Sequence, residues 1–495
     1  MNDEGMSDCG MSAVEEAGYL PGPFAGMAGR RVVVHRAWGE TVAVALPVLD
    51  ETRARSLCAH IRARAQDTLR GMETARIVAA IDRASACLLD RTHPSRRKAE
   101  ALLPVVTGYD AETVRLGLTR YLKTFRRPQL LRFLAEDFSD PGVLDGFRPA
   151  VKGGFVRARG PDLLLHVWAG NVPALPLWSL VAGLLVKAGT VGKLASAEPL
   201  TAGWFARAIA EADPELGECL AMTWWKGGEG GVEATFLGAA DCVMAYGGDA
   251  TLAALRARVP VSTRFLPHGH RIGFAMIGRE ALDSRRAGAA ALAAALDVVR
   301  YEQQGCYAPQ MLFVERGGPV APDEFARHLA HALAALAARH PRRHLDPGEG
   351  AAIAAWRSGH EMRALDDAGT VLLGDPEDSW SVVHLDAPAP LSPSGLNRTV
   401  AVVAVDDLAE VPALVAPHRA YLQSAGLAAA PARLFSLAED LAAAGVTRIT
   451  ALGRMTAPEA GWHHDGRFSL LDLVTVTEIE ASAEAAADDV APYAE

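Results

Sequence analysis

A cysteine at position 306 lies in a stretch whose composition is unusual for a buried thiol. Residues 301–310 read YEQQGCYAPQ, so that polar Gln303 and Gln304 and the small Gly305 directly precede Cys306. Cysteine more often lies in a hydrophobic core, where it behaves as a small apolar residue. Gly305 leaves space beside the sulfur in which backbone N–H groups could approach a bound carbonyl. Because the thiolate is the nucleophile in cysteine enzymes, this context favours a nucleophilic Cys306 over a structural one.

The other cysteines show no comparable context. Cys58, Cys87 and Cys219 lie in segments with helical hydrophobic periodicity and Cys242 lies in an apolar strand, so we interpret all four as structural. The six cysteines of the chain form no CxxC pair. This spacing argues against a zinc ribbon or a disulfide framework and is typical of a reducing cytoplasm.

A second candidate, Asn171, lies in the stretch HVWAGNVPALP at 166–176, where a predicted strand ends and an apolar helix begins. Turns at the carboxyl ends of strands in an open α/β sheet direct side chains into a ligand crevice. An amide donor at such a turn could stabilise an oxyanion. Asn is also a common N-cap residue of helices, and the residue types alone leave both interpretations open.

A glycine-rich turn, WWKGGEGGVEATF at 224–236, lies between a predicted strand and a predicted helix. Glycines in such a turn permit close approach of a phosphate group. The turn contains Gly227, Gly228, Gly230 and Gly231 but does not match GxGxxG, so an ordinary loop is the alternative.

Histidines supply two further candidate segments. FLPHGHRIGF at 265–274 contains His268, His270 and Arg271, for which a catalytic, phosphate-facing or structural role is open. No carboxylate or cysteine accompanies these histidines at ligand spacing, so we predict no metal site. GWHHDGR at 461–467 is interpreted as a tight polar loop, and its residue types alone assign it no role.

The elements expected to position these residues alternate between helix and strand. Helical periodicity covers 53–89 and 111–125, and strands and helices alternate from 166 to about 259. Further strands and helices follow Cys306, among them a helix over 322–339. Strands separated by helices of this length are typical of a parallel, doubly wound sheet, so the predicted class is α/β. Residues 1–28, rich in Gly and Met, are expected to form a loose tail.

Bulk composition excludes several classes of function. The 495 residues are enough for two or three domains, and the net charge of −10 provides no basic field for nucleic acid. The N-terminus has acidic residues where a secretory signal has basic ones. The longest apolar stretch, 172–186, is shorter than the ~20 residues that span a bilayer. We therefore expect a cytoplasmic protein without a membrane span.

Taken together, the segments resemble the acyl-CoA reductase family of bacterial bioluminescence (the LuxC-type long-chain fatty acyl reductases), a branch of the aldehyde dehydrogenase superfamily. The resemblance covers roughly residues 150–480. The matching segments are AGNVP, YGGD at 246–249, GHRIGF, DVVRYEQQGCYAPQ, LNRTVAVV and GVTRITALGRMTAPEAGWHHDG. The QQGC segment and the last block are specific in combination, whereas each glycine-rich piece alone is not.

The resemblance implies an aldehyde-dehydrogenase-like fold with a Rossmann-type cofactor domain, an α/β catalytic domain and a small oligomerisation β-element. The implied domains are a flexible tail (1–28), N-terminal helices with the NADP-binding domain (29–268), the catalytic domain with Cys306 (269–450), and a return to the cofactor domain (451–495). Strands near 145–160 and the stretch 468–482 would form a homo-oligomer.

The resemblance also implies residue roles. Asn171 would be the oxyanion amide, Lys193 would contact the adenosine ribose or its phosphate, and Cys306 would be the nucleophile. The cofactor phosphates would lie near Tyr246, Gly247 and Gly248, with Gly227, Gly228 and Gly231 as further cofactor-binding residues.

Two departures from ordinary aldehyde dehydrogenases define the expected subtype. Ser196 replaces the glutamate that grips both ribose hydroxyls in NAD-dependent relatives, which favours NADP(H). The segment that carries their water-activating glutamate is replaced by the region of Gly269, His270 and Arg271. A thioester reductase has no need of that water, and His270 is a candidate for proton transfer.

The expected function is the NADPH-dependent reduction of an acyl thioester to the aldehyde through a cysteinyl thioester on Cys306. The donor would be a long-chain fatty acyl-CoA or an acyl-protein synthetase. An NAD(P)-dependent aldehyde dehydrogenase that forms the acid is one alternative. An inactive acyl-binding paralogue is another.

Overall fold

The computed structural model describes residues 14–228 and 230–492, which cluster into two compact units. Within the described residues, the first unit comprises the chain up to Thr107, Gly117–Gly269 and the chain from Phe468 onward. The second comprises Gly108–Leu116 and His270–Arg467. The chain thus leaves the first unit at Gly269, next to the predicted boundary at 268/269, but returns at Phe468 and not at residue 451.

The bounds of the elements are as follows. The strands are β1 (Glu15–Glu16), β2 (Gly29–Ala37), β3 (Glu40–Val48), β4 (Arg148–Pro149), β5 (Phe155–Arg159), β6 (Leu163–Val167), β7 (Gly189–Lys193), β8 (Leu220–Thr223), β9 (Cys242–Tyr246), β10 (Arg264–His268), β11 (Ile272–Ile277), β12 (Pro309–Glu315), β13 (Thr370–Leu373), β14 (Ser381–Leu385), β15 (Thr399–Val405), β16 (Leu422–Ala428), β17 (Arg448–Ala451) and β18 (Thr475–Ile479). The helices are α1 (Glu51–Asp67), α2 (Thr74–Leu89), α3 (Pro94–Thr107), α4 (Ala111–Lys123), α5 (Arg127–Asp137), α6 (Pro176–Leu185), α7 (Thr201–Ala212), α8 (Pro214–Gly217), α9 (Gly230–Ala239), α10 (Asp249–Arg256), α11 (Ala287–Val299), α12 (Pro322–Arg339), α13 (Pro347–Asp366), α14 (Val411–Val415), α15 (Pro431–Ala444) and α16 (Ala481–Asp488).

The first unit is built on a five-stranded parallel sheet with the order β10-β9-β6-β7-β8. Apolar side chains of α1 and α9 pack into one core with β6, β7 and β9. Two small sheets, β1-β3-β2 and β18-β5-β4, complete the unit. The order reverses at β6, and in open α/β sheets ligands bind beyond the carboxyl ends of the strands at such a switch.

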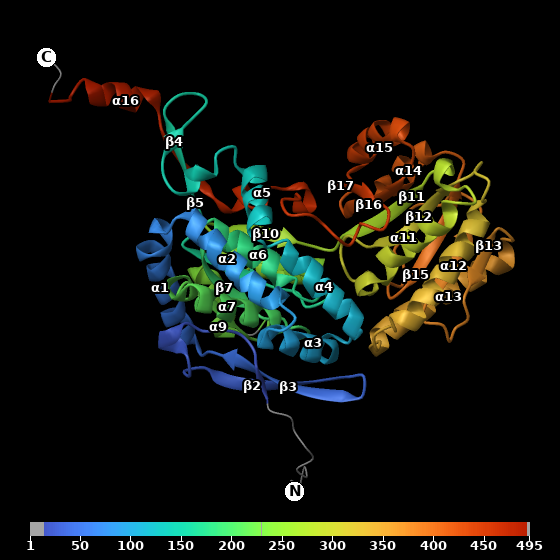
Figure 1. The fold of residues 1–495 in the computed structure, drawn as a ribbon, viewed down its shortest axis with the longest axis horizontal. Helices are drawn as coiled ribbons and strands as arrows, with labels where there is room; N and C mark the ends of the chain where they lie inside the picture. The colour runs from blue at the N-terminus through green and yellow to red at the C-terminus, as the bar shows by residue number, and fades with distance from the viewer. Residues whose placement is uncertain (1–13, 229, 493–495) are drawn as a thin grey trace, which may run out of the picture. The chain divides into compact units, whose positions relative to one another are not determined.

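The second unit contains a seven-stranded sheet with the order β13-β14-β15-β12-β11-β16-β17, parallel except for the edge strand β13. Its inner strands are buried on both faces, and successive residues of β11 alternate between two cores. Ala275 and Ile277 face the core that includes α11 and α12, which lie side by side in Figure 1. Phe274 and Met276 face the core that includes α14 and α15.

Residues 14–28 are not a tail. Strand β1 pairs with β3, and Tyr19 exchanges two backbone hydrogen bonds with Met222 on β8. Ala17 and Phe24 are buried. This segment therefore belongs to the first unit, while residues 1–13 lie outside the described part of the chain.

The helical pattern over 53–89 forms two helices and not one. Helix α1 begins after Asp50, whose carboxylate accepts from the N–H of Arg53, and it ends at Asp67. Helix α2 begins at Thr74, whose N–H and hydroxyl both donate to Asp145 at 2.9 and 2.8 Å. The break at 68–73 is thus fixed by a residue far along the chain.

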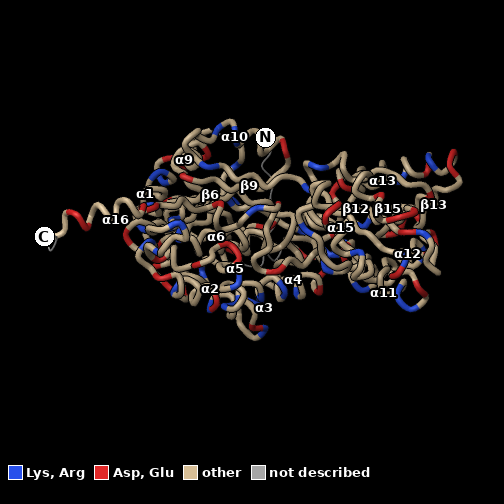
Figure 2. Tube along the Cα trace, turned by 90° about the horizontal axis from the view of Figure 1, so that it is seen from above, with Lys and Arg blue, Asp and Glu red and all other residues tan. Residues whose placement is uncertain are grey.

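The described chain carries charges of both signs, and its longest apolar stretch includes a buried helix. Figure 2 shows Lys and Arg interspersed with Asp and Glu along the trace. The apolar stretch 172–186 contains α6, whose ten residues are mostly buried within the first unit. None of the helices in the described part of the chain combines the length and the apolarity that crossing a bilayer requires.

Candidate active site

Cys306 lies in a short turn between the 3₁₀ turn η5 (Arg300–Gln303) and β12, and its side chain is partly buried. The N–H of Ala308 donates to the carbonyl of Gly305 and closes the turn. A Cβ added to Gly305 would lie 2.4 Å from the ring of Tyr307. Glycine at 305 is therefore required by this ring.

The residues before Cys306 adopt a strained backbone. Tyr301, Glu302 and Gln303 all have positive φ, between 51 and 58°. A second run, Leu396, Asn397 and Arg398, has positive φ between 49 and 72°. Non-glycine residues rarely adopt this left-handed region, and each such residue costs on the order of 1–3 kcal/mol. Two consecutive runs of this kind need specific contacts to hold them.

The two left-handed runs hold each other, and we call them together the clamp (301–303 and 396–398). The guanidinium of Arg398 donates two hydrogen bonds of 2.7 Å to the carboxylate of Glu302, and both side chains are buried. The backbone N–H of Arg398 donates to Gln303 Oε1 at 2.8 Å, and the N–H of Asn397 donates to the carbonyl of Glu302 at 3.0 Å. The clamp fixes the backbone three residues before the thiol.

The two glutamines that make this stretch unlike a core strand hold the turn in place through hydrogen bonds. Gln303 is buried, and its amide donates to the carbonyls of Pro309 at 2.8 Å and Thr399 at 3.1 Å. Gln304 donates to Asn397 Oδ1 at 3.3 Å. Buried amides paired in this way fix one conformation of the turn that carries Cys306.

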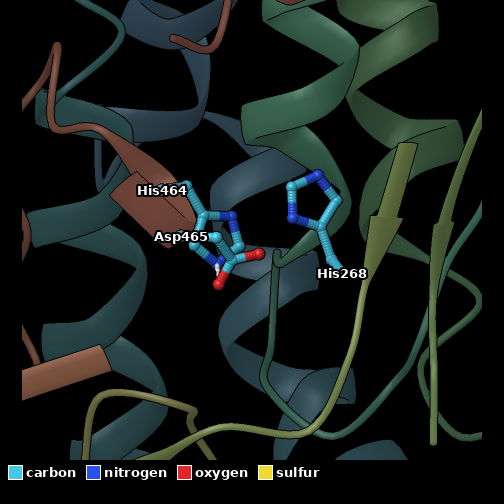
Figure 3. Close-up of side chains that lie close together, drawn as sticks. All are labelled: His268, His464 and Asp465. Atoms are coloured by element: carbon cyan, nitrogen blue, oxygen red, sulfur yellow. Dashed lines mark ion pairs between the residues drawn. The ribbon is translucent and has the colours of Figure 1, made fainter. Parts of the chain in front are cut away.

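An imidazole that the sequence did not single out lies beside the thiol. His464 Nε2 is 3.8 Å from Cys306 Sγ. His464 belongs to the 3₁₀ turn η8 (His464–Gly466), and the ring of Trp462 lies 4.9 Å from its ring. Figure 3 draws the side chains of His464 and the adjacent Asp465, and it also labels His268, which ends β10.

The neighbouring Asp465 is held by a cation. Its buried carboxylate accepts from Arg271 Nε at 2.8 Å and from Gln423 Nε2 at 3.3 Å. Asp465 has φ of 56°, a conformation that Asp tolerates better than most residues. Its Oδ1 lies 3.9 Å from His464 Nε2. The loop at 461–467, whose role the sequence left open, thus supplies an imidazole and an acid beside Cys306.

Burial and, to a smaller extent, the nearby Asp465 carboxylate raise the pKa of the Cys306 thiol to about 12, while Arg271 and Arg448 act in the opposite direction. At neutral pH the thiol is therefore protonated. Because only the thiolate is an effective nucleophile, attack by Cys306 requires a proton acceptor.

His270, the predicted proton-transfer residue, belongs to the second unit and is exposed. Within the described residues, the imidazole that contacts Cys306 Sγ is that of His464, and His270 forms no hydrogen bond with the thiol. Asn171 is an exposed residue of the first unit in the turn between β6 and α6. The helix α6 begins at Pro176, so Asn171 is not its cap.

The predicted ribose-binding residues lie at the carboxyl end of β7. Lys193 ends the strand, burial lowers its pKa, and its Nζ lies 5.8 Å from the centre of the Trp225 ring. The hydroxyl of Ser196 accepts a hydrogen bond of 2.9 Å from the indole N–H of Trp224. On the same indole ring lies the guanidinium of Arg31, 4.5 Å from the ring centre. Arg31, from β2, was not singled out by the sequence.

The glycine-rich turn is organised by a buried acid. Glu233 accepts from the N–H of Gly228 at 3.1 Å and from Trp225 Nε1 at 3.3 Å, and it pairs with Arg258. A Cβ on Gly231 would overlap the side chain of Glu51, so packing against Glu51 accounts for the glycine at this position. Gly227 lies in the same turn. Since its N–H is already donated to Glu233, Gly228 does not present that group to a phosphate.

The third predicted cofactor segment follows β9. Tyr246 stacks on His268 with ring centres 4.7 Å apart, and Gly247 donates its N–H to the carbonyl of His268. Gly248 precedes the first turn of α10. These residues lie at the same edge of the parallel sheet as Lys193, because both β7 and β9 end there.

The fold is aldehyde-dehydrogenase-like. An indole-3-acetaldehyde dehydrogenase solved with NAD⁺ has a TM-score of 0.73 at 14% identity, covering 94% of this chain and 97% of that one. An NADP-dependent glyceraldehyde-3-phosphate dehydrogenase from Bacillus halodurans, solved with NADP, has a TM-score of 0.69 at 15% identity and covers 94% and 100%.

Within that fold the chain belongs to the acyl-CoA reductase (LuxC) family, whose family model matches residues 69–476. It is 25% identical to long-chain acyl-protein thioester reductase 2 of Photobacterium leiognathi over 73% of each chain. It is 26% identical to the long-chain acyl-protein thioester reductase of Aliivibrio fischeri over 79% of this chain and 78% of that one. The predicted resemblance is confirmed at the level of family and fold.

Proposed function

We propose that the protein reduces an acyl thioester to the aldehyde, with Cys306 as the nucleophile and His464 as the group that takes and returns its proton. The observation that carries this proposal is the 3.8 Å approach of His464 Nε2 to Cys306 Sγ in a turn fixed by the clamp. Membership in the acyl-CoA reductase family and the acyl-protein thioester reductase relatives support the reaction class.

The first step would be acyl transfer to the thiol. His464 Nε2 accepts the Sγ proton as the sulfur attacks the thioester carbonyl, and an S–C bond forms on Cys306. The bond between the carbonyl carbon and the donor sulfur then breaks. The proton held on His464 passes to the departing thiolate, so the products are a cysteinyl thioester and a free thiol.

A reduced nicotinamide dinucleotide, when bound, supplies the hydride that converts this thioester to the aldehyde. The residues of the first unit fit such a ligand, since Lys193 and Ser196 lie at the end of β7 and the Tyr246–Gly248 segment follows β9. As the C–S bond to Cys306 breaks, His464, after taking up a proton from solvent, is placed to give it to the sulfur. The amide of Asn171 is proposed to stabilise the oxyanion, as the family resemblance implies.

We favour NADP(H) over NAD(H). Ser196 adds no carboxylate that would repel a 2′-phosphate, and its hydroxyl is bonded to Trp224, on which the Arg31 guanidinium lies. A guanidinium near the ribose edge suits a phosphate. In equilibrium titration, tighter binding of NADP than NAD is expected; the opposite order would contradict this assignment.

An acid-forming aldehyde dehydrogenase is less well supported, because it needs a carboxylate that activates water beside the cysteine. The two carboxylates described near Cys306 are both engaged by arginines. Asp465 accepts from Arg271, and Glu302 accepts from Arg398. Neither is available as the base for a deacylating water.

Association between copies is proposed through the β18-β5-β4 sheet. All five residues of β18 are exposed, including Val476 and Ile479. An edge strand that leaves such apolar side chains exposed is a surface on which another chain can pack. The acyl donor would be a long-chain acyl-CoA or an acyl-protein synthetase.

The test is incubation with a long-chain acyl-CoA in the absence of nucleotide, followed by intact-mass measurement. We expect one acyl group per chain and one equivalent of released thiol, both lost in Cys306→Ala. Cys87→Ala, which removes another partly buried thiol, should acylate normally. Acylation that survives Cys306→Ala would identify a different nucleophile and remove the proposal.

A further inference from the structure

A pocket of about 490 Å³ lies in the second unit, where α12 ends and the chain turns toward α13. Arg342, Arg343 and His344 line it together with small and apolar residues, and no acidic residue lines it. Its volume falls in the range of about 300–1,000 Å³ usual for ligand sites. The sequence analysis assigned no role to this segment.

Arg342 carries a charge that the chain leaves uncompensated. Its guanidinium is half-buried and forms no hydrogen bond or ion pair with any described residue. Burial lowers its pKa, and of the two acids that act on it, Glu302 pairs with Arg398 and Glu349 pairs with Arg343. A half-buried guanidinium without a counterion is suited to bidentate binding of a phosphate.

Arg343, in contrast, is fixed in place. It pairs with Glu349, the capping-box residue of α13, and donates to Asn397 Oδ1 at 3.2 Å. Its guanidinium also lies 6.0 Å from the ring centre of Tyr109. The pocket therefore has one anchored arginine and one whose charge is free for a ligand.

Asn397 links the pocket to the turn that carries Cys306. Asn397 Oδ1 accepts from Arg343 and also, at 3.3 Å, from Gln304, which lies two residues before Cys306. Helix α12 runs back from the end of β12 toward its beginning, so its C-terminus lies at the edge of the sheet where the Cys306 turn also lies. The pocket and the thiol thus share one end of the second unit.

We propose that this pocket binds the phosphate groups of a coenzyme A thioester while its pantetheine arm carries the acyl group to Cys306. The inference rests on the proposed function and specifies its donor. In a CoA thioester the pantetheine arm separates the phosphates from the reacting carbonyl. A cationic pocket at the same end of the second unit as the Cys306 turn suits those phosphates. The pocket would contribute to binding and not to the chemical step.

The experiment compares three donors of the same acyl chain: acyl-CoA, acyl-phosphopantetheine and acyl-pantetheine. Steady-state reduction is measured for the wild type, Arg342→Gln and Arg339→Gln. Arg339 is the matched control, because it is exposed in the last turn of α12 and does not line the pocket.

We expect Arg342→Gln to raise KM for acyl-CoA about tenfold with kcat within twofold, and to leave KM for acyl-pantetheine unchanged. Arg339→Gln should behave as the wild type with all donors. A preference for acyl-CoA over acyl-phosphopantetheine would mean that the pocket binds the nucleotide phosphates. Equal use of these two donors would mean that it binds the phosphate of the pantetheine arm. Equal KM values of the wild type for all three donors, or equal effects of Arg342→Gln on all three, would overturn the inference.

Failure of the proposed function gives a different result. If no donor is reduced, the reductase proposal is removed, and binding of desulfo-CoA by calorimetry then tests the pocket alone. Weakening of that binding about tenfold in Arg342→Gln, with Arg339→Gln unchanged, would support the pocket. Identical binding to all three proteins would overturn it.

Discussion

At the scale of single residues, the thiol of Cys306 is a weak nucleophile at neutral pH unless a base removes its proton. Its pKa is raised to about 12, chiefly by burial. The thiolate fraction of such a group grows about tenfold per pH unit until the pH reaches the pKa. As the proposed nucleophile, Cys306 therefore differs from cysteine nucleophiles that are ionised at rest, and its activation would depend on a base.

The pH dependence of alkylation tests this property. Below its pKa the thiol is neutral, so we expect iodoacetamide to modify Cys306 more than about tenfold more slowly than free cysteine at pH 7.5. The rate should rise continuously to beyond pH 10. Peptide mapping separates Cys306 from the other cysteines. A rate that is already constant below pH 8 would show a thiolate stabilised at neutral pH.

The role of His464 has its own test, in which adjacent residues serve as variant and control. We expect His464→Gln to slow single-turnover thiol release from acyl-CoA by about 10²–10⁴, the usual contribution of a positioned base. The loss should be greatest near neutral pH and shrink in alkaline solution, where hydroxide ionises the thiol. His463→Gln should stay within threefold. Equal loss in the two variants would indicate a structural role only.

Sequence reasoning singled out Cys306 but not His464, and the role of Cys306 stays a prediction. The composition around Cys306 predicted a special cysteine, because Gln303 and Gln304 do not suit a core. It did not reach His464, since 158 residues separate it from Cys306 and only the packing of η8 brings the two together. The available signal was local: histidines, an aspartate and glycines at 461–467 form a turn with φ of 56° at Asp465 and 70° at Gly466.

At the scale of elements, the clamp is the feature that decides where the thiol lies. Removing one partner of a buried ion pair leaves an uncompensated charge and typically costs about 3–5 kcal/mol. The clamp also opposes the strain of six left-handed residues. Its loss should therefore affect both stability and the Cys306 turn.

We expect Arg398→Met to lower the free energy of unfolding by about 3–5 kcal/mol in urea titration and to reduce acylation of Cys306 in the folded fraction. Arg327→Met is the control, because the Arg327–Asp323 pair is exposed on α12 and such pairs contribute about 0.3–0.5 kcal/mol. Equal stability of the two variants would mean that the Glu302–Arg398 pair does not hold the turn.

Elements with strong local patterns were predictable, and those fixed by distant contacts were not. The helix expected over 322–339 is α12, with the same bounds. The helix expected over 53–89 is interrupted, because Asp145 caps α2 at Thr74 from 71 residues away. Similarly, residues 14–28 lack a strong pattern and gain their order from pairing with β3 and β8.

At the scale of the whole molecule, each unit is discontinuous in sequence. The first unit is completed by the chain from Phe468 onward, whose β18 pairs with β5 over five residue pairs. The N–H groups of Leu470 and Leu471 donate to Asp137, and Arg264 donates to the carbonyls of Asp472 and Val474. The last segment is therefore part of the first unit's structure.

Deletion of residues 468–495 should consequently destabilise the first unit. We expect the midpoint of thermal unfolding to fall by roughly 5–10 °C, corresponding to several kcal/mol, or the protein to aggregate through the exposed β5. Deletion of 481–495, which removes only the exposed α16 and the residues after it, is the control and should change the midpoint little. A similar midpoint for both deletions would contradict this account.

The clamp has a consequence for protein engineering. Its left-handed residues are not glycines, so the shape of the nucleophilic turn is not encoded in the decapeptide that contains Cys306. A designer who grafts only residues 301–310 onto another scaffold should obtain a relaxed loop and an inert sulfhydryl. Transfer of this chemistry would require 395–399 as a second, spatially adjacent insert.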